Sequence, residues 1–243
     1  MTLGDRMKEY ESCSKGFLIR RNPVIIRIDG KAFHSFTKGM QKPFDSILSA
    51  SMIETCKFLC ANIMNCKLAY TQSDEISLLL VDYERLETEA WFSNNIQKMV
   101  SISASMATLA FNNAFNALGK DMYSTKQGIA VFDSRAFSVP KEDVCNYFIW
   151  RQQDATKNSI SSIAQSMFSH KELHGKNGDQ KQEMIFQKSG NNWNNYPAYQ
   201  KRGSCVVKEQ YNVNGTTRTR WVEDADTPIF SKDREYVERY VVV

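Results

Sequence analysis

The sequence predicts an α+β protein with a ferredoxin-like βαββαβ core, to which helices and strands are added on the C-terminal side. Strand-like β-branched runs and two segments of helical period follow the order strand, helix, strand, strand, helix, strand. No repeat, low-complexity tract or Gly/Pro/Ser-rich linker divides the 243 residues, which favours a single domain, 1–243. Hydrophobic residues make up 42% and aromatic residues 12% of the chain, enough for a packed core. We expect that core over about residues 20–139 and the additions over about residues 140–243.

The first elements of the core are predicted from hydrophobic patterns and their boundaries. Residues 23–29, PVIIRID, are typical of a short buried strand, because a β-branched run lies between a proline and a glycine. The loop GKAFHSFTKG follows this strand. Asp45 is placed to cap a helix whose apolar residues between Leu48 and Ile63 recur with the 3.6-residue period. Residues 67–70 then predict a second short strand.

The second half of the core begins with the turn TQSDE. Residues 76–82, ISLLLVD, predict a third strand directly after this turn. A long helix is predicted from about Trp91 to Leu118, and Gly119 ends it.

The remaining elements are a fourth strand and the C-terminal additions. The fourth strand is expected over residues 128–139, with a break near Asp133. Helices are expected from residue 141 to about residue 169, and strands after Met184, in a more polar final third of the chain.

Composition and charge narrow the class of protein. The net charge of +4 and the pI near 8.6 are compatible with a nucleic-acid partner. No apolar run approaches the ~20 residues of a membrane helix, and the N-terminus lacks the apolar segment of a signal peptide. We therefore expect no membrane association and a cytoplasmic location. The six cysteines form no CxxC pair, and with three histidines they indicate reduced structural thiols rather than a zinc site.

Three carboxylates are predicted to meet at one edge of the sheet. In a ferredoxin-like sheet the first and third strands are antiparallel neighbours, so the end of one lies beside the start of the other. Asp29 ends the first strand, and Asp74 and Glu75 precede the third. Facing carboxylates repel unless a cation lies between them, and hard oxygen ligands favour Mg²⁺ or Mn²⁺, as two-metal nucleotidyl transfer requires. In the alternative interpretation Asp29 begins a turn and the other two acids cap a hairpin.

Residues near these acids suit phosphate groups. The backbone N–H groups of the GKAF turn can form an anion-binding concavity. Lys42 and Lys98 can neutralise outer phosphates, or they are ordinary surface lysines. His34 can stack on a base or transfer a proton, and a structural role is the alternative.

Several of these motifs resemble the tRNA-histidine guanylyltransferase family over about residues 5–220. The similarity is greatest to bacterial-type relatives that act as template-dependent 3'-to-5' RNA polymerases. RIDGKAFH followed by AYTQSDE is a specific pair of motifs. The matching segments are RIDGKAFH at 27–34 with Phe36, Lys42-Pro43, AYTQSDE at 69–75, Phe132-Asp133 with Arg135, Trp150-Arg151-Gln152 with Asp154, and Asn195 and Pro197 before Lys201-Arg202-Gly203.

The resemblance implies a polymerase-palm core that works with two Mg²⁺ ions. Carboxylates matching Asp29 and Asp74 and the backbone carbonyl matching Gly30 hold the metal. Glu75 is a further candidate catalytic residue, which would support the metal ligands without binding the metal itself. ATP activates the 5'-monophosphate of tRNA as an adenylylated end, and the 3'-OH of an incoming nucleotide, such as GTP, then displaces AMP. The implied nucleotide-binding residues are Gly30, Lys31, Ala32, Phe33, His34, Lys42, Asp45, Ser73 and Lys98.

The resemblance also implies a homotetramer that binds tRNA. Candidates for contact with the RNA are Arg27, Arg135, Arg151, Asn158, Lys201 and Arg202, together with Arg218 and Arg220. One segment departs from the family pattern. Where the eukaryotic enzymes have HINNLYN after the WRQ segment, this chain has TKNSISS at 156–162 and keeps only Asn158. This difference favours templated repair of tRNA 5' ends over untemplated addition of guanine to histidine tRNA.

Three other functions are alternatives to tRNA repair. Guanine addition to histidine tRNA is the nearest alternative, and a nucleotide cyclase uses the same palm and paired carboxylates. A non-catalytic RNA-binding module is disfavoured, because ISLLLVD lacks the basic, glycine and aromatic pattern that RNA-binding ferredoxin-like sheets carry in that strand.

Overall fold

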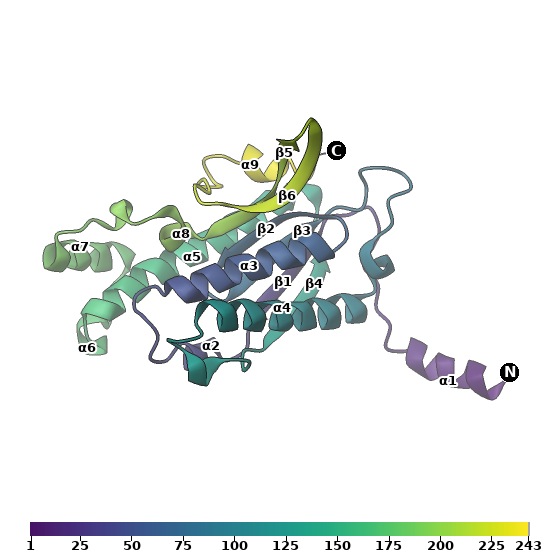
Figure 1. The fold of residues 1–243 in the computed structure, drawn as a ribbon, viewed down its shortest axis with the longest axis horizontal. Coiled ribbons are helices and arrows are strands. Elements are labelled where there is room, and N and C mark those ends of the chain that lie inside the picture. Colours follow the sequence, from purple (N-terminus) through teal and green to yellow (C-terminus); the bar gives the residue numbers. More distant parts are fainter. Residues whose placement is uncertain (243) are drawn as a thin grey trace.

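The computed structural model describes residues 1–242, and within them one antiparallel sheet forms the centre of the molecule (Figure 1). The strand order is β4-β1-β3-β2-β5-β6, and each neighbouring pair is antiparallel. The first four strands in this order have the arrangement expected of the ferredoxin-like core. The strands are β1 (Val24–Gly30), β2 (Cys66–Gln72), β3 (Glu75–Leu80), β4 (Phe132–Ser138), β5 (Ser204–Val213) and β6 (Thr216–Asp224).

Helices cover both faces of this sheet. On one face α3 (Ser46–Asn62) and α4 (Ile96–Leu118) pack over a core that contains Ile26 and Phe111. On the other face α5 (Val144–Met167) and α9 (Glu235–Glu238) enclose a second core that contains Ile25 and Phe148. The two cores follow from the sequence, because successive side chains of a strand point to opposite faces. The shorter helices are α1 (Leu3–Ser12), α2 (Phe33–Phe36), α6 (His170–Leu173), α7 (Gly178–Ser189) and α8 (Ala198–Arg202), with 3₁₀ turns at Trp91–Asn94, Ser124–Lys126, Lys141–Asp143 and Trp193–Asn195.

Helix boundaries confirm the main sequence predictions for the core. Asp45 caps α3 by accepting a hydrogen bond from the N–H of Leu48 at 2.9 Å. Asn95 caps α4, which therefore begins a few residues later than expected, and Gly119 follows its last residue. The loop after β1 is not wholly irregular, because it contains the short helix α2.

The later elements differ from the sequence predictions in two details, although strands do follow Met184 as expected. β4 begins at Phe132 rather than at residue 128, and it continues through Asp133 without a break. The region after Met184 is helical before it is extended, because α7 and α8 precede β5. α7 is polar, so its hydrophobic period is weak, but a capping box at Asn177 starts it and Gly190, at φ 69°, ends it.

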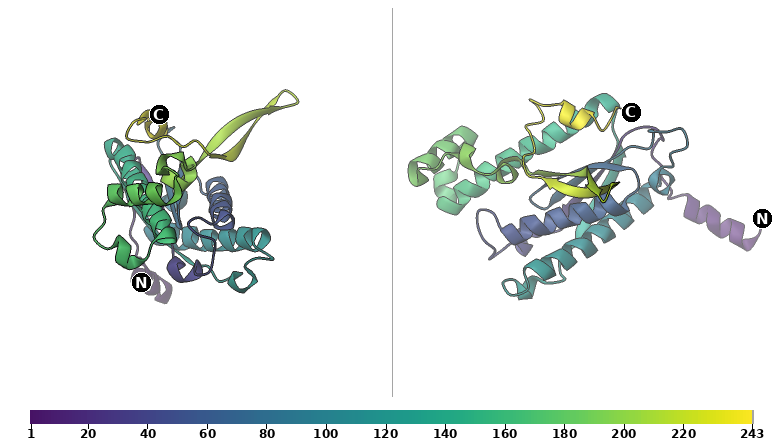
Figure 2. Two further views of the ribbon diagram at one scale, coloured as in Figure 1. Left: turned by 90° about the vertical axis from the view of Figure 1, so that its left-hand side faces the viewer. Right: turned by 45° about the horizontal axis from the view of Figure 1, so that its top comes forward.

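Two segments extend away from the main body. The ribbon of β5 and β6 continues past the edge of the sheet (Figure 2), and every residue of α1 is exposed. Within residues 1–242, no helix combines the length and the apolar character needed to cross a membrane.

Candidate active site

Asp29 and Asp74 come together where β1 ends and β3 begins. The antiparallel register of the two strands puts Asp29 opposite Glu75, directly next to Asp74. The N–H of Gly30 donates to the carbonyl of Asp74 at 3.1 Å, which ties the end of β1 to the turn before β3. The convergence predicted from strand order is therefore present in the fold. We call this place the carboxylate edge, defined by Asp29 and Asp74.

The electrostatics of the carboxylate edge favour a bound cation. Burial is the main cause that raises the pKa of Asp74, and the charge of Asp29 raises it further, while the hydrogen bond from Ser73 Oγ, at 2.9 Å, opposes the rise. No lysine or arginine among residues 1–242 forms an ion pair with either aspartate. A divalent cation would relieve this unbalanced negative charge.

The residues present fit Mg²⁺ as part of its coordination shell. Among residues 1–242, no group of three or more His, Cys, Asp or Glu is arranged to enclose a metal ion. Mg²⁺ is usually bound by one or two carboxylates, and waters and substrate phosphates complete its octahedron. The carboxylate edge therefore suits an ion that binds together with a nucleotide, rather than one enclosed by protein alone.

Asp133 is a further acid at this edge, and it is not among the site residues predicted from the sequence. The register of β1 and β4 puts Asp133 opposite Asp29, and paired residues of antiparallel strands lie on the same face. Its carboxylate is 3.4 Å from Arg135 of the same strand. Alternation along β4 would have identified Asp133, but only once the pairing register was known.

Glu75 differs from its neighbour because arginines hold both of its carboxylate oxygens. Oε2 lies 2.9 Å from a terminal nitrogen of Arg27, and Oε1 lies 2.8 Å from Nε of Arg151. Glu75 is 5% exposed. Burial raises its pKa, and the charges of Arg151 and Arg27 oppose that rise. Both carboxylate oxygens of Glu75 are therefore engaged by arginines, although the strand register puts Glu75 on the same face of the sheet as Asp29.

The loop after β1 is fixed by aromatic packing. Phe33 and Phe36 are buried and pack on Phe111 of α4, so these two phenyl rings anchor the loop in the core. A Cβ atom on Gly30 would lie 2.3 Å from the ring of Phe33, which explains the glycine there. The N–H of Gly30 and that of Lys31 donate to chain carbonyls. Two donors of the predicted phosphate concavity are thus already used.

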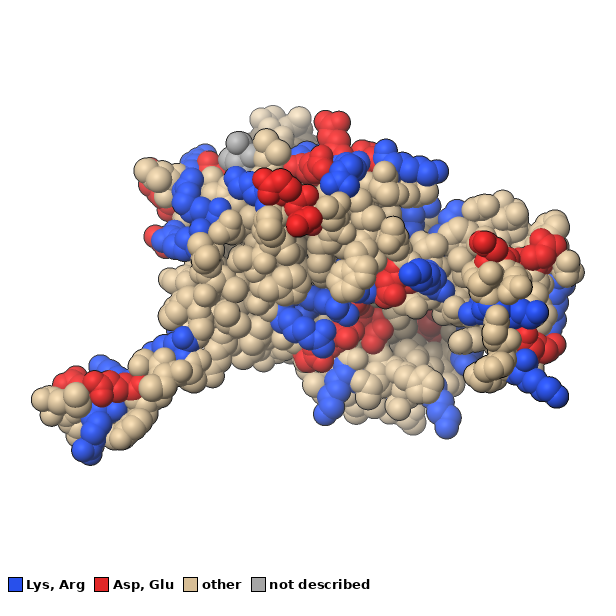
Figure 3. Space-filling view, turned by 180° about the vertical axis from the view of Figure 1, so that it is seen from behind, with Lys and Arg blue, Asp and Glu red and all other residues tan. Residues whose placement is uncertain are grey.

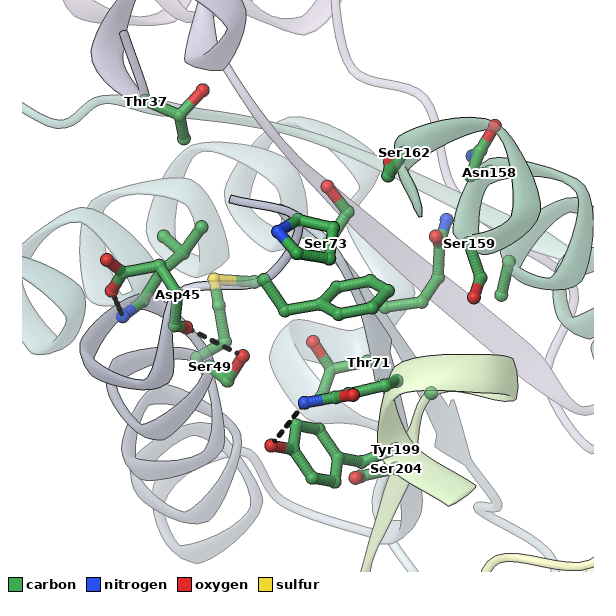
Figure 4. A pocket seen from close by; sticks show the side chains of 18 of the residues that line it. Thr37, Asp45, Ser49, Thr71, Ser73, Asn158, Ser159, Ser162, Tyr199 and Ser204 are labelled. Atoms are coloured by element: carbon green, nitrogen blue, oxygen red, sulfur yellow. Dashed lines mark hydrogen bonds between the residues drawn. The ribbon is translucent and has the colours of Figure 1, made fainter. Parts of the chain in front are cut away.

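A pocket of about 340 Å³ lies beside the turn that carries Asp74 (Figure 4). Its walls come from the segment between α2 and α3, the start of α3, the β2–β3 turn, the middle of α5, and α8. Ser73 lies at its centre in Figure 4. Five of the predicted site residues line this pocket: His34, Lys42, Asp45, Ser73 and Asn158. We call it the nucleotide pocket, after the residues predicted from the sequence to bind nucleotide that line it.

Neutral hydroxyl and amide side chains are spread through the lining of the nucleotide pocket, next to apolar ones such as Met40 and Phe44. Several of these polar residues are not among the site residues predicted from the sequence: Ser49, Thr71, Ser159, Ser162, Tyr199 and Gln200. Serine and threonine are too common on exposed surfaces for any pattern to single these residues out. Asp45 lines the pocket, but its Oδ1 accepts from Leu48 N–H, and its Oδ2 accepts from Gln41 N–H and the hydroxyl of Tyr123. Its observed contacts are structural.

Comparison with known proteins establishes the family. The family model described as tRNAHis guanylyltransferase matches residues 4–140. The chain belongs to the tRNA(His) guanylyltransferase family. The tRNA(His) guanylyltransferase of Schizosaccharomyces pombe is 31% identical over 220 residues, which cover 84% of this chain and 79% of the relative. An uncharacterised protein of Acanthamoeba polyphaga mimivirus is 28% identical over 226 residues, which cover 85% and 77%. Members of this family are nucleotidyltransferases, and this chain is therefore an enzyme.

Solved structures of the tRNA(His) guanylyltransferase family share the whole fold. A bacterial tRNA(His) guanylyltransferase-like protein in complex with ATP is 50% identical, with a TM-score of 0.90 and full coverage of both chains. Such a bacterial protein in complex with GTP is 49% identical, with a TM-score of 0.85 and 99% coverage of each chain. The tRNA(His) guanylyltransferase of Saccharomyces cerevisiae is 25% identical, with a TM-score of 0.68, over 89% of this chain and 95% of that one. The predicted α+β fold class is confirmed.

Lys98 does not join the nucleotide pocket within one chain. It lies in the first turn of α4, where its Nζ is 6.0 Å from the ring of Phe92. Phe111, which contacts the loop after β1 through Phe33, lies roughly 20 Å further along the same helix at about 1.5 Å per residue. Lys42 therefore lines the pocket and Lys98 does not, and contact between Lys98 and a nucleotide phosphate stays a prediction.

Arg151 also requires a correction. It was expected to contact RNA, but it is 4% exposed, and its guanidinium pairs with Glu75 and Asp154. A side chain buried in this way cannot reach a phosphate of a docked RNA without leaving both carboxylates. Arg27 is partly buried and is held by Glu75 in the same way.

The other candidates for RNA contact are accessible in different degrees. Arg135 is exposed on β4, and Arg218 and Arg220 are exposed on the β5–β6 ribbon. Lys201 donates to the carbonyl of Asn194, and Arg202 donates through Nε to the carbonyl of Thr227, so these two are partly engaged by the chain. On the face shown in Figure 3, basic side chains alternate with acidic ones near the middle of the molecule, rather than forming one broad basic surface.

Proposed function

We propose that this enzyme adds nucleotides to the 5' end of tRNA in the 3'-to-5' direction and selects each nucleotide by base pairing. The observation that carries the proposal is the contact between the nucleotide pocket and the carboxylate edge. Ser73 lines the pocket and donates to the carboxylate of the next residue, Asp74, at 2.9 Å. A nucleoside triphosphate whose base and sugar occupy the pocket would therefore extend its phosphates toward Asp29 and Asp74.

The proposed reaction has two phosphoryl steps. An oxygen of the tRNA 5'-phosphate first attacks the α-phosphate of ATP, and pyrophosphate leaves. The 3'-OH of the incoming nucleotide then attacks the adenylylated 5'-phosphate, and AMP leaves. When bound, two Mg²⁺ ions would neutralise charge on the phosphate oxygens and favour ionisation of the attacking hydroxyl. Asp29, Asp74 and the carbonyl of Gly30 would hold them.

Side chains of the pocket would contact the phosphates and the base of the nucleotide. Lys42 lines the pocket and is exposed, so it can neutralise an outer phosphate without losing a protein partner. His34, also exposed at the pocket, can stack on a base or donate a hydrogen bond. The bacterial relatives in complex with ATP and with GTP support both nucleotides as substrates of this chain.

Selection by a template is supported by the wall that α5 contributes to the pocket. Asn158, the one residue kept from the HINNLYN segment, donates to Asp154 at 3.4 Å. Ser159 accepts a hydrogen bond from the indole of Trp193 at 3.1 Å. This wall thus offers mainly small hydroxyl groups and no aromatic stack for one particular base. Watson–Crick pairing with the opposite strand would position the 3'-OH of the correct nucleotide, and positioning is worth several kcal/mol of barrier.

The test uses 5'-truncated tRNAs that differ only in the base opposite the missing position. Each tRNA is incubated with ATP, Mg²⁺ and one of the four nucleoside triphosphates, and the product is sized on a gel. We expect the preferred nucleotide to follow the template base through all four choices.

Two results would contradict this proposal. Addition of guanine whatever the template base would place the enzyme with the histidine-tRNA branch. Formation of a cyclic nucleotide from the triphosphate alone, with no extension of RNA, would favour the cyclase alternative.

We also propose that the enzyme acts in the cytoplasm as a homotetramer. The resemblance to the family supports this assembly, and exposed apolar side chains on α1, such as Leu3, Met7 and Tyr10, suit contacts between chains. Light scattering on the purified protein measures the number of chains directly. A monomer at working concentrations would rule the tetramer out.

A further inference from the structure

A chain of ion pairs runs beneath the carboxylate edge. Arg27 contacts Glu75 at 2.9 Å, Glu75 contacts Arg151 at 2.8 Å, and Arg151 contacts Asp154 at 2.6 Å. We call these four residues the Glu75 network. Asn158 extends it by donating to Asp154 at 3.4 Å. Its residues come from β1, β3 and α5, so the network crosses from the palm core to the C-terminal additions.

The network is poorly suited to stabilising the fold. Glu75 and Arg151 are 5% and 4% exposed, and the loss of hydration of such buried charges costs several kcal/mol for each ion. The contact between Arg151 Nε and Glu75 Oε1 is close but is not an aligned hydrogen bond, and Arg27 Nε is also buried without a hydrogen-bond partner. Pairs of this kind contribute little net stability, but they restrict the geometry of the groups that they join.

Trp150 covers the network on its outer side. Its ring lies 4.1 Å from the guanidinium carbon of Arg151 and 5.9 Å from that of Arg27. This stacking holds both planar guanidinium groups and limits access of water to the carboxylate between them. The side chain of Arg151 is thus held by its ion pairs with Glu75 and Asp154 and by the ring of Trp150, which stacks on its guanidinium group.

Arg151 connects the two parts of the proposed site. On one side it holds Glu75, the residue that follows Asp74 in the chain. On the other side it belongs to α5, whose Asn158 and Ser159 line the nucleotide pocket. A shift of α5 would therefore move the wall of the pocket and the start of β3 together, as long as Arg151 bridges them.

We propose that Arg151 is a positioning residue that holds the carboxylate edge in register with the nucleotide pocket. The inference rests on the proposed function, because it concerns the alignment of nucleotide phosphates with Asp29 and Asp74. Arg151 touches neither substrate nor metal in this role and acts through Glu75. A displacement of about 1 Å at a reacting centre can cost ~100-fold in rate, so the loss of this bridge affects chemistry more than binding.

The first test replaces Arg151 by methionine, which keeps the length of the side chain and removes its charge. Label transfer from α-labelled ATP to the 5'-phosphate of tRNA gives kcat and the KM for ATP. We expect kcat to fall about 10- to 100-fold, because misalignment raises the barrier, while KM changes less than about threefold. Arg151→Lys restores the charge but cannot bridge both carboxylates, so its kcat should lie between those of Arg151→Met and the wild type.

Tyr147→Phe is the matched control for this variant. The hydroxyl of Tyr147, on α5, forms a buried hydrogen bond with Ser77 of β3 at 2.8 Å, so the variant weakens contact between the same helix and strand without touching the network. We expect Tyr147→Phe to lower the melting temperature while kcat stays near the wild-type value. An equal loss of kcat in both variants would show that Arg151 acts through general stability alone, and would overturn the proposal.

A second variant keeps the test decisive if Arg151→Met does not fold. The variant Arg151→Gln leaves an amide N–H that can still donate to one of the two carboxylates, and we expect it to fold and to show a low kcat. A folded Arg151→Gln variant with wild-type kcat would overturn the proposal. If the wild-type enzyme itself transfers no label to tRNA, the proposed function fails, and this inference fails with it. If the wild type transfers label and Arg151→Met does so at the same kcat, only the inference fails.

Discussion

The carboxylate edge and the nucleotide pocket are neighbours built in different ways. The edge is formed by the ends of two paired strands, and it gathers negative charge without a protein cation to balance it. The pocket is formed by helices and turns, including α5 and α8 of the C-terminal additions, and its lining combines neutral polar groups with apolar side chains. Under the proposed function, the strands would carry the chemistry, while the added helices would shape the place where the nucleotide binds.

This division predicts separable effects of mutation. Changes at the edge should remove the reaction and leave nucleotide binding largely intact, whereas changes in the pocket should weaken the affected nucleotide step. The two regions are joined directly at the Ser73–Asp74 turn and through the Glu75 network beneath it. The predictions that follow test the separation in order of expected effect.

The largest effect is expected at the two aspartates. Asp29→Asn and Asp74→Asn each remove a charged metal ligand while keeping the shape of the side chain. We expect activity to fall ~1,000-fold, because a metal ion supplies several kcal/mol of charge stabilisation in the transition state and about 4 kcal/mol corresponds to that factor, while far-ultraviolet circular dichroism remains unchanged. Label transfer to tRNA measures the loss. Turnover within about tenfold of the wild type in either variant would exclude that residue as a ligand.

An intermediate effect separates two lysines. Lys42 lines the pocket. Lys98 lies in the first turn of α4, roughly 20 Å along the helix from Phe111, which contacts the loop after β1. A charge-assisted contact is worth roughly 1.5–3 kcal/mol, so Lys42→Ala should lose about 10- to 150-fold in the affected nucleotide step. Lys98→Ala is the matched control and should lose less than about threefold if one chain forms the whole site.

A different result for the control would be informative. If Lys98→Ala is impaired as strongly as Lys42→Ala, the site includes Lys98 of a second chain. A tRNA that already carries a 5'-triphosphate bypasses adenylylation and assigns each lysine to a step. A loss that is equal with 5'-monophosphate and 5'-triphosphate substrates excludes a role confined to activation.

Local sequence patterns were sufficient for the core and for the edge. The hydrophobic period and the caps at Asp45 and Gly119 define α3 and the end of α4. The order of the strands then determines that Asp29 meets the TQSDE turn, because antiparallel neighbours bring the end of one beside the start of the other. Both steps depend on local or topological rules, which a single sequence contains.

The pocket and the role of Arg151 could not be predicted in this way. A serine, lysine or arginine is compatible with solvent, with a ligand or with an internal partner, and only tertiary packing decides among them. Arginine commonly contacts phosphate, so its residue type points Arg151 to RNA, yet Arg151 is buried against Glu75. Lys42 and Lys98 are equally good candidates for phosphate contact from the sequence, but only Lys42 lines the pocket. α7 gives little signal in the sequence, because its polar composition has a weak hydrophobic period.

The smallest effect, on stability, distinguishes a metal site from a hairpin cap. If Asp29 and Asp74 only shaped a turn, replacing Asp74 by Asn would be neutral or destabilising. If they await a cation, the variant should be more stable without metal, because it removes a buried charge and its repulsion by Asp29. We expect the melting temperature to rise by about 1–3 °C, since roughly 1 kcal/mol shifts it by about 2–4 °C in a domain of this size. With ATP present in every measurement, adding Mg²⁺ should raise the melting temperature of the wild type, because a ligand that binds the folded state stabilises it, and should leave that of Asp74→Asn unchanged. Differential scanning calorimetry with EDTA and with Mg²⁺ measures both shifts. Equal responses of the two proteins to Mg²⁺ would show that the ion binds elsewhere, and would return the two aspartates to a purely structural role.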